Sequence, residues 1–362
     1  MRRILVAPLD WGLGHATRCM PVIREIQALG HVPVIAADGE AFNLLKDAFP
    51  TTEIIHLRGY RPVYPDDRGN MVWTMLWQSP AFIQRIFREH QALQTLIQKC
   101  ALDAVISDNR YGLWSNKVPS VIITHQLFIK MPAFVKWMER PVRQLNRFFI
   151  EQFDECWVPD FADEENLSGA LSHGQRLPCN TRFIGPLSRF ADIQDDDAPH
   201  HVPDLLIVLS GPEPQRSLLE KEIIPEAAST GLNTLIIRGI PGKQERSQIN
   251  DRIFCVCNMD STQMFKTLKR AKFIVSRPGY TTIMDLAALG KKAIFIPTPG
   301  QTEQEYLAWR AEHTHVGVVQ RQGNIHLQTA LEKLKSIGSA PPPAQSLEYK
   351  SAIARFIDSL TR

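Results

Sequence analysis

A histidine in a glycine-rich loop could act as a base near neutral pH. Gly12, Gly14 and His15 follow the apolar stretch Arg3–Pro8, which predicts a buried strand leading into a helix. The glycines allow the backbone to approach a bound group, and the N-terminus of the helix favours an anion. A histidine at this position can accept the proton of an attacking hydroxyl. We therefore expect Gly12 and Gly14 to line a substrate site and His15 to be catalytic, unless His15 only braces the loop.

Two more loops carry ionisable side chains after expected strands. Asp108 and Arg110 follow the strand expected at Ala104–Ser107, and His125 follows the strand expected at Ser120–Thr124. Because parallel strands place their carboxyl ends at one edge of a sheet, these side chains should face the same crevice as the glycine loop. We interpret Asp108 as a second candidate base, and Arg110 and His125 as acceptor contacts. The alternative is a local pair of Asp108 and Arg110 that braces the turn.

The segment from 276 to 290 predicts an anion-binding turn at a helix N-terminus. It reads as a strand end, a glycine turn and a helix of small residues. The backbone N–H groups near Gly279 and the hydroxyls of Thr281 and Thr282 could hold a diphosphate. Asp285 follows on the same side of the helix, where a carboxylate can accept both hydroxyls of a ribose.

At these residues the sequence resembles the GT-B glycosyltransferases. It is most similar to the group that contains the UDP-N-acetylglucosamine transferase of peptidoglycan lipid synthesis (glycosyltransferase family 28 C-terminal type). The family's Arg-x-Gly turn corresponds to Arg277–Gly279, its threonine to Thr282 and its ribose-binding acid to Asp285. Arg277 would brace the turn or offset charge. The N-terminal loop and the Ser107–Gly112 loop are even more similar to uncharacterised bacterial proteins that are predicted glycosyltransferases.

The resemblance implies further donor contacts in the second half of the chain. Ser210, Gly211 and Arg216 match the family's phosphate loop. The backbone at Met259 corresponds to the segment that pairs with the uracil edge, and Gln304 corresponds to a donor-sugar contact. The resemblance therefore implies a nucleotide-diphosphate sugar as co-substrate and no resident cofactor.

Apolar runs alternate with helix-period segments along the whole chain, which predicts βαβ units and parallel sheets. We expect an α/β protein with two Rossmann-like domains facing across a cleft (GT-B), since 362 residues exceed one ordinary core. The expected domains are 1–187, which binds the acceptor, and 204–343, which binds the nucleotide sugar. A polar linker at 188–203 joins them, and a helix at 344–362 should pack back on the first domain.

The combined pattern predicts transfer of a hexose or N-acetylhexosamine from a nucleotide-diphosphate sugar, in particular a UDP sugar, to a hydroxyl acceptor. With His15 as base in a direct displacement, the anomeric carbon is inverted. A UDP-sugar 2-epimerase of the same fold is an alternative, and so is a non-catalytic nucleotide-sugar-binding subunit. A dinucleotide site would use the glycine loop with Asp38, but Thr17 stands where its third glycine belongs.

Composition excludes several other classes. The weak net charge of +3 does not indicate a nucleic-acid binder, which would usually show a concentrated basic face, so nucleic acid is not an expected partner. The six cysteines contain no CxxC pair, which indicates reduced thiols. The acidic run Asp195–Asp197 lies in the polar linker rather than after a buried strand, so we predict no metal site there. Helix ends and arginines can stabilise a leaving diphosphate without magnesium.

The chain shows no predicted leader and no apolar segment of about 20 residues, so a cytoplasmic protein is expected. The helix expected at Pro132–Phe153 combines basic and aromatic side chains. It could lie on the anionic inner face of a membrane, where a lipid-linked acceptor would be found. The alternative is a solvated helix whose aromatic stripe faces the core.

Overall fold

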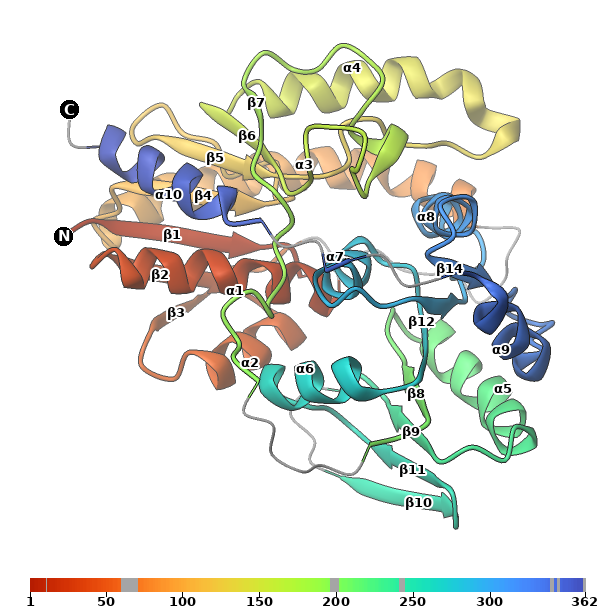
Figure 1. Ribbon diagram of the computed structural model, residues 1–362. Helices are drawn as coiled ribbons and strands as arrows, with labels where there is room; N and C mark the ends of the chain where they lie inside the picture. The colour runs from red at the N-terminus through yellow and green to blue at the C-terminus, as the bar shows by residue number, and fades with distance from the viewer. Residues whose placement is uncertain are drawn as a thin grey trace. The chain divides into compact units, whose positions relative to one another are not determined.

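The structure, a computed structural model, describes residues 1–10, 12–59, 71–195, 202–240, 245–338, 342–343 and 346–360, with the backbone alone at 71–81 and 133. The described chain divides into two compact units (Figure 1). Unit 1 contains residues 1–59, 72–187 and 346–360, and unit 2 contains the described residues between 188 and 343. Each unit is a predominantly parallel sheet with helices on both faces, which confirms the predicted pair of Rossmann-like domains.

The sheet of unit 1 is entirely parallel across its described strands. In chain order these are β1 (Arg3–Pro8), β2 (Val32–Ala37), β3 (Glu53–His56), β4 (Ala104–Asp108), β5 (Ser120–Ile123), β6 (Glu155–Val158) and β7 (Thr181–Phe183). Their spatial order is β3-β2-β1-β4-β5-β6-β7. The chain therefore runs outward on one side of β1 and resumes on the other side with β4. This reversal is a topological switch point, where open α/β sheets bind ligands.

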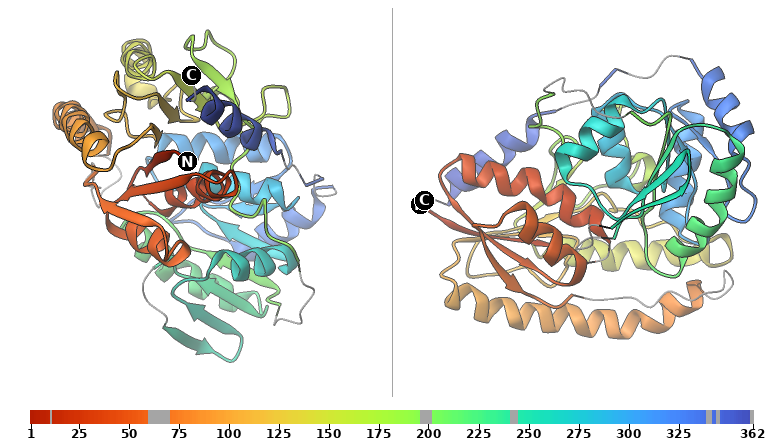
Figure 2. Two further views of the ribbon diagram at one scale, coloured as in Figure 1. Left: turned by 90° about the vertical axis from the view of Figure 1, so that its left-hand side faces the viewer. Right: turned by 90° about the horizontal axis from the view of Figure 1, so that it is seen from below.

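Helices cover both faces of this sheet because its central strands are apolar on both sides. α1 (Leu13–Ala28) and α3 (Met71–Lys99) lie on opposite faces (Figure 2). The other helical segments of unit 1 are α2 (Gly39–Ala48), η1 (Ala133–Met138), α4 (Glu139–Ile150), η2 (Gly169–Leu171) and α10 (Glu348–Ser359). The single helix expected at Pro132–Phe153 is thus divided into η1 and α4, because the backbone at Val135 is not helical (φ −123°, ψ 21°).

The C-terminal helix α10 packs within unit 1 against α1. Phe356 meets the fully buried Trp157 of β6 edge-on, with 5.7 Å between the ring centroids. Arg2 donates to the carbonyl of Leu360 at 3.0 Å. These contacts connect the last described helix to the first strands of the chain.

Unit 2 repeats the same design. Its strands are β8 (Leu205–Val208), β9 (Thr234–Ile237), β10 (Arg246–Asn250), β11 (Ile253–Val256), β12 (Phe273–Ser276), β13 (Ala293–Phe295) and β14 (Gly317–Val319). The order is β10-β11-β9-β8-β12-β13-β14, and only the β10–β11 pair is antiparallel among the described strands. The helices are α5 (Gln215–Ser229), α6 (Ser261–Arg270), α7 (Tyr280–Ala288), α8 (Thr302–His313) and α9 (Leu327–Ser336). The switch point of unit 2 lies between β8 and β12.

The core of unit 2 follows from the alternation of side chains along β8. Leu205 and Ile207 belong to a buried cluster with α5 and α9, whereas Leu206 points to the other face, toward α6 and α8. Each fully buried leucine or isoleucine contributes about 1.5–3 kcal/mol relative to exposure. The two clusters therefore hold the loops at the carboxyl edge on a rigid frame.

The described cysteines are all free thiols, and only Cys179 is exposed. Across the described residues, no helix combines the length and apolarity that a membrane crossing requires.

Candidate active site

The glycine loop of unit 1 leads directly from β1 into α1. Gly12 precedes the helix with φ 84°, in the left-handed region that favours glycine. It offers no side chain to cap α1, and the first turn contains no acid. His15 lies in that first turn, and its side chain is 16% exposed. His15 therefore lies at the switch point of unit 1, and its side chain is still accessible to solvent.

A buried cluster of ionisable groups forms beneath His15. Asp108 is the last residue of β4 and lies opposite Pro8 of β1 in the sheet register. Its Oδ1 lies 2.9 Å from Nδ1 of His15. Arg18 donates from Nε to Oδ2 at 2.5 Å and from Nη2 to Oδ1. Asp108 and Arg18 are 0% and 1% exposed, so this ion pair is fully enclosed.

The charge of Asp108 is fixed by this arrangement. Burial alone would raise the pKa of the carboxyl, but Arg18 and His15 outweigh burial and hold the pKa well below its usual range. A carboxylate with a lowered pKa is a weak base, and a fully buried one cannot reach an acceptor hydroxyl. The alternative in which Asp108 itself is the base is therefore not supported, and Asp108 instead orients His15.

His125 joins the same cluster rather than an open surface. Its Nδ1 accepts a hydrogen bond from Nη1 of Arg18 at 3.1 Å, and the side chain is buried. Cys19 also donates its thiol to Asp108, at 3.5 Å. Arg18, which connects Asp108 with both histidines, was not among the predicted site residues. Its position three residues after His15 on α1 is the signal that could have identified it, because such pairs share a helix face.

Arg110 lies apart from the cluster, which corrects its assignment to the acceptor surface. Its guanidinium donates to Glu89 at 2.9 Å and to the carbonyl of Leu57 at 3.0 Å. Arg110 is 1% exposed, and burial of this region raises the pKa of Glu89 despite the arginine. The local pair of Asp108 and Arg110 does not form either. Arg110 therefore connects α3 with the end of β3 as part of the scaffold.

In unit 2 the predicted diphosphate turn begins a helix without a side-chain cap. Gly279 precedes α7 and has no side chain that could cap the helix. The first turn of α7 contains no acidic residue. The neighbouring helix α6 differs, because Asp260 caps it by accepting from the backbone N–H of Gln263 at 2.8 Å. Thr281 and Thr282 are partly exposed on the first turn of α7. The N-terminus of α7 is thus suited to an anion, because its free N–H groups carry the positive end of the helix dipole.

The loop after β8 approaches this turn across the switch point of unit 2. Val208 of β8 is paired in register with Ser276 of β12, and Ser210 and Gly211 follow (φ 103° at Gly211). A side chain at Gly211 would come within 3.9 Å of the hydroxyl of Thr298. In the described structure the hydroxyls of Ser276 and Thr298 are buried and have no hydrogen-bond partner. Buried polar groups usually have hydrogen-bond partners, and a bound ligand could supply the partners of these two hydroxyls. Neither residue was predicted.

Asp285 is buried in the second turn of α7, and its carboxylate has protein partners. Ser188 donates to Oδ1 at 2.7 Å, and Nε of Arg189 donates to Oδ2 at 3.2 Å. Burial raises the pKa of Asp285, and Arg189 only partly offsets this effect. A ribose would have to exchange with one of these donors, so the ribose contact stays a prediction.

Arg277 braces the turn, as one of its two expected roles required. Its guanidinium donates to the carbonyls of Ile296 and Gln215 and to the side chain of Gln322, at 2.9, 3.2 and 2.7 Å. The residue is 1% exposed, and burial lowers its pKa to about 10. No carboxylate of the described chain accepts a hydrogen bond from it. The acceptors that Arg277 bonds are neutral, although Glu222 acts on its charge without a hydrogen bond.

The remaining predicted donor residues have structural partners. Arg216 pairs with Glu220 at 3.3 Å and with Glu213. Gln304 is buried and accepts the backbone N–H of Thr298 at 2.8 Å, so it holds the loop that carries the orphan hydroxyl. Met259 is partly buried beside α6. Their contacts with base, phosphate and sugar stay predictions.

The predicted linker acids are described only in part. Asp195 pairs with Lys269 at 2.8 Å and with Arg270 at 3.0 Å. Asp196 and Asp197 lie outside the described residues. Asp195 thus fastens the linker to α6.

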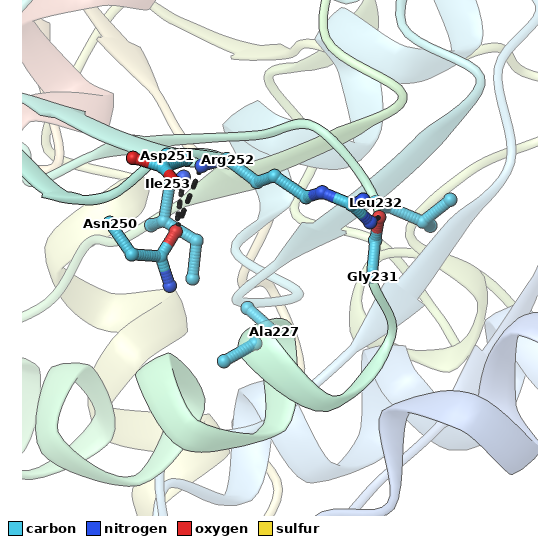
Figure 3. Close-up of a pocket in the computed structure, with 8 residues that line it drawn as sticks. Ala227, Gly231, Leu232, Asn250, Asp251, Arg252 and Ile253 are labelled. Carbon is cyan, nitrogen blue, oxygen red and sulfur yellow. Dashed lines mark hydrogen bonds between the residues drawn. The ribbon is translucent and has the colours of Figure 1, made fainter.

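Two cavities lie near the sheets. One of about 220 Å³ is lined by Ala227, Gly231, Arg252 and neighbouring residues (Figure 3). It lies at the amino edge of the unit 2 sheet, where β9 and β11 begin, so it is not the predicted donor site. The other, of about 440 Å³, is lined by Asp38, Arg58, Gly59 and Arg85 at the carboxyl edge of the unit 1 sheet.

Comparison with known proteins agrees with this arrangement. Residues 226–358 match the glycosyltransferase family 28 C-terminal domain. An uncharacterised glycosyltransferase of Methanosarcina acetivorans is 24% identical over 321 residues, which cover 84% of this chain and 79% of the relative. The structure of Phytolacca americana UGT2, solved with UDP-2-fluoro-glucose and pterostilbene, superposes with a TM-score of 0.59 at 13% identity and full coverage of both chains. Acinetobacter baumannii MurG gives a TM-score of 0.56 at 13% identity, with 99% of both chains covered.

The two Rossmann-like units and the solved neighbours show the GT-B fold. Similarity to proteins named glycosyltransferases over 84% of the chain, together with the match of residues 226–358 to the family 28 C-terminal domain, identifies the protein as a glycosyltransferase of this fold.

Proposed function

We propose that this enzyme transfers a hexose or N-acetylhexosamine from a UDP sugar to a hydroxyl acceptor, without a metal ion and with inversion at the anomeric carbon. The observation that carries the proposal is the contact of 2.9 Å between Nδ1 of His15 and Oδ1 of Asp108. It gives unit 1 an accessible base oriented by a buried carboxylate, which is the usual arrangement of an activated general base.

The proposed protonation of His15 depends on the two groups that share its Nδ1. This atom lies 2.9 Å from Oδ1 of Asp108 and also 2.9 Å from Nη2 of Arg18. Arg18 can only donate hydrogen bonds and the Asp108 carboxylate can only accept them, so Nδ1 can bond only one of the two at a time. Because Nη2 of Arg18 already donates to Asp108, we assign the proton to Nδ1. This tautomer gives a charge-assisted bond to Asp108 and leaves the lone pair of Nε2 available to an acceptor hydroxyl.

In the proposed step the acceptor oxygen attacks the anomeric carbon of the donor. Its proton passes to Nε2 of His15 as the new carbon–oxygen bond forms. The bond from the anomeric carbon to the diphosphate breaks, and its electron pair leaves with UDP. Asp108 stabilises the imidazolium that results. Attack from the face opposite the leaving group gives inversion.

Unit 2 would hold the donor. The uncapped start of α7, with Thr281 and Thr282, and the loop at Ser210 and Gly211 supply donors for the diphosphate. The buried charge of Arg277 would lower the energy of the developing negative charge from beneath the turn, which supports a leaving group without magnesium. The Phytolacca enzyme was solved with a UDP sugar analogue and the Streptomyces glycosyltransferase SsfS6 with thymidine diphosphate, so these neighbours support a nucleotide-diphosphate donor. The preference for uridine rests on the sequence resemblance. We also propose a lipid-linked acceptor at the inner face of a membrane.

The proposal can be tested before the acceptor is known, because water can replace it slowly. Purified enzyme would be incubated with UDP-N-acetylglucosamine or UDP-glucose, and the sugar released would be followed by NMR. We expect free UDP and a sugar that first appears with inverted configuration. A sugar released with retained configuration contradicts His15 as base in a direct displacement. Change at carbon 2 without release identifies an epimerase instead.

The choice of nucleotide can be measured separately by thermal shift. Ligands that bind the folded state raise its melting temperature according to their affinity. We expect UDP to raise it more than GDP or dTDP. Equal shifts would leave the transferase intact but remove the uridine preference.

A further inference from the structure

A polar cavity of about 440 Å³ lies at the carboxyl edge of the unit 1 sheet, where β2 and β3 end. The described residues that line it come from these strand ends and from α3, and they are Asp38, Arg58, Gly59 and Arg85. None of these four has an aromatic or aliphatic side chain that would favour an apolar ligand. The proposed transfer step does not use this cavity, and its charges indicate what it could bind.

Two arginines give the cavity hydrogen-bond donors that the protein does not fully use. Arg85 donates from Nη2 to the backbone carbonyl of Arg58, and its Nε is buried without a hydrogen-bond partner in the described structure. Glu89 lies one turn further along α3, but it is already paired with Arg110 at 2.9 Å. Arg58 is exposed, and in the part of the chain that the structure describes its guanidinium forms no ion pair. Buried N–H groups usually have an acceptor, and an anion in the cavity could serve as one.

The opposing negative charge at the cavity is smaller. Asp38 is the one acid among the described lining residues, and its Oδ1 lies 3.7 Å from Nδ1 of His56. Asp38 also precedes α2 as its N-cap residue, but its side chain does not cap that helix. The backbone N–H groups at the start of α2 therefore add positive potential at this edge of the cavity. Glu40, in the first turn of α2, is exposed and does not line the cavity.

We propose that this cavity binds an oxyanion, either a phosphate or a carboxylate, that the acceptor carries. A guanidinium presents parallel N–H donors that match two oxygens of such a group. These bonds are charge-assisted, so they are stronger than bonds between neutral partners. A volume of about 440 Å³ also exceeds what one ion requires, since a water molecule occupies about 30 Å³ in the liquid. Space therefore remains for the part of the acceptor that bears the anion.

The cavity is next to the candidate acceptor site within unit 1. A Cβ atom at Gly59 would lie 2.1 Å from Oδ1 of Asp10, so only glycine lets the chain after β3 pack against the residue that leads into the glycine loop. β3 is two strands from β1 in the sheet, which is roughly 10 Å at the usual strand spacing. We therefore expect the anion to lie roughly that far from the hydroxyl that reacts at His15, an extension that rests on the proposed function.

The first test is calorimetry of the full-length enzyme with inorganic phosphate at constant ionic strength. UDP is present at saturation, so that the anion site proposed in unit 2 is filled. Arg58→Gln with Arg85→Gln should weaken phosphate binding by about 10-fold or more, because charge-assisted bonds are lost. Arg88→Gln with Lys99→Gln removes two exposed cations of α3 and is the matched control. Absence of phosphate binding by the wild type, unchanged binding by the first double variant, or an equal loss in the control overturns the proposal.

A variant that should bind phosphate more tightly excludes misfolding as the cause of an effect. Asp38→Asn removes the carboxylate that opposes the anion, so phosphate binding should tighten by about 3-fold or more. Glu40→Gln removes a neighbouring acid that does not line the cavity, and it should change phosphate binding less. Circular dichroism and melting temperature establish that every variant is folded. Weaker phosphate binding by Asp38→Asn contradicts the proposal.

Comparison of inorganic phosphate with glycerol 3-phosphate and glycerol distinguishes a carried anion from a free ion. We expect glycerol 3-phosphate to bind at least as tightly as phosphate, and glycerol to bind about 10-fold more weakly or worse. Phosphate binding about 10-fold tighter than that of glycerol 3-phosphate would show a site for the free ion and overturn the proposal. None of these measurements uses turnover. Failure of the proposed function would appear separately, as absent UDP binding and no release of sugar from the donor.

Discussion

The two switch points share a topology but differ in how their charges are balanced. In unit 1 the buried Asp108 has Arg18 and His15 as partners, so the cluster is neutralised by the protein alone. In unit 2 the buried Arg277 bonds only neutral acceptors, and the hydroxyls of Ser276 and Thr298 have no partner in the described structure. The comparison indicates that the sheet topology determines where ligands bind, whereas the local charges determine which ligand suits each switch point. The buried charges of unit 1 are paired with each other, whereas the groups in unit 2 that accept hydrogen bonds from Arg277 are neutral.

The buried carboxylates at the two sites show the same contrast. Arg18 and His15 overcome burial at Asp108 and lower its pKa, whereas burial prevails at Asp285 and raises its pKa. Asp285 has one hydroxyl and one arginine Nε as partners. The next four predictions test whether this difference is as large as the contacts indicate.

The largest effect is expected for Asp108→Asn, which leaves Arg18 buried without its anion. Breaking a buried ion pair from one side costs about 3–5 kcal/mol of unfolding free energy. Urea unfolding at pH 7 measures it. Because the pKa of Asp108 is lowered in the folded state, its contribution is present above pH about 4 and is lost as the pH falls through the folded pKa. Asp103→Asn, at the other end of β4, is the control, and equal losses would contradict the special role of the cluster.

His15→Ala should slow transfer about 100-fold or more while UDP binding stays nearly unchanged. The reason is that the base lies on unit 1 and the proposed nucleotide site lies on unit 2. Donor turnover measures the transfer rate, and calorimetry with UDP measures the binding affinity. His31→Ala provides a comparison at the opposite edge of the sheet, where His31 contacts the backbone N–H of Arg2. Full activity in His15→Ala would remove it as base.

Asp285→Asn should weaken UDP binding about 10-fold if its carboxylate accepts ribose hydroxyls. The sharper measurement compares UDP with 2′-deoxy-UDP, because the variant should no longer distinguish them. Asp204→Asn removes a partly buried carboxylate at the amino edge, where it pairs with Lys272, and should change neither affinity. If the wild type already binds both nucleotides equally, Asp285 does not contact the ribose and bonds only Ser188 and Arg189.

The smallest effect concerns how stability varies with pH in the same variant. The pKa of Asp285 is raised in the folded state, so its stabilising contribution is fully present below pH about 4 and is lost as the pH rises through the folded pKa. Asparagine does not ionise. The unfolding free energy of Asp285→Asn relative to wild type should therefore improve between pH 4 and 7, by less than the effects above. A difference that is constant with pH would show that the carboxyl is not perturbed.

Much of the fold could be predicted because its signals are local. β1 was predicted with the bounds observed, and β4 and β5 to within one residue, since each is an apolar run that ends at a turn. β10 was not predicted, because Arg246–Asn250 is exposed along its whole length and carries no alternation. The short strands β3, β7 and β14 were missed as well; each lies at the edge of its sheet, where no long apolar run is required.

For the candidate site, the sequence predicts which residues lie at the switch points but not which side chains they contact. Glycine turns and helix starts identify loops, so His15, Asp108 and Gly279 were found from the chain itself. Partners distant in the chain could not be found this way. Arg110 bonds Glu89 of α3, and Asp285 bonds Ser188 of the linker, 97 residues away. Which neighbour a buried charge selects depends on tertiary packing, which no local pattern records.

The return of α10 to unit 1 also has a consequence for synthesis on the ribosome. Tyr349, Ile353 and Phe356 bury themselves in a unit whose other residues precede 188. Unit 2 is an insertion, and its residues are all translated before α10. A nascent chain can therefore finish unit 2 while unit 1 still lacks its last helix. Premature termination near 345 would spare the former and leave an apolar groove open on the latter, where chaperones or proteases could recognise it.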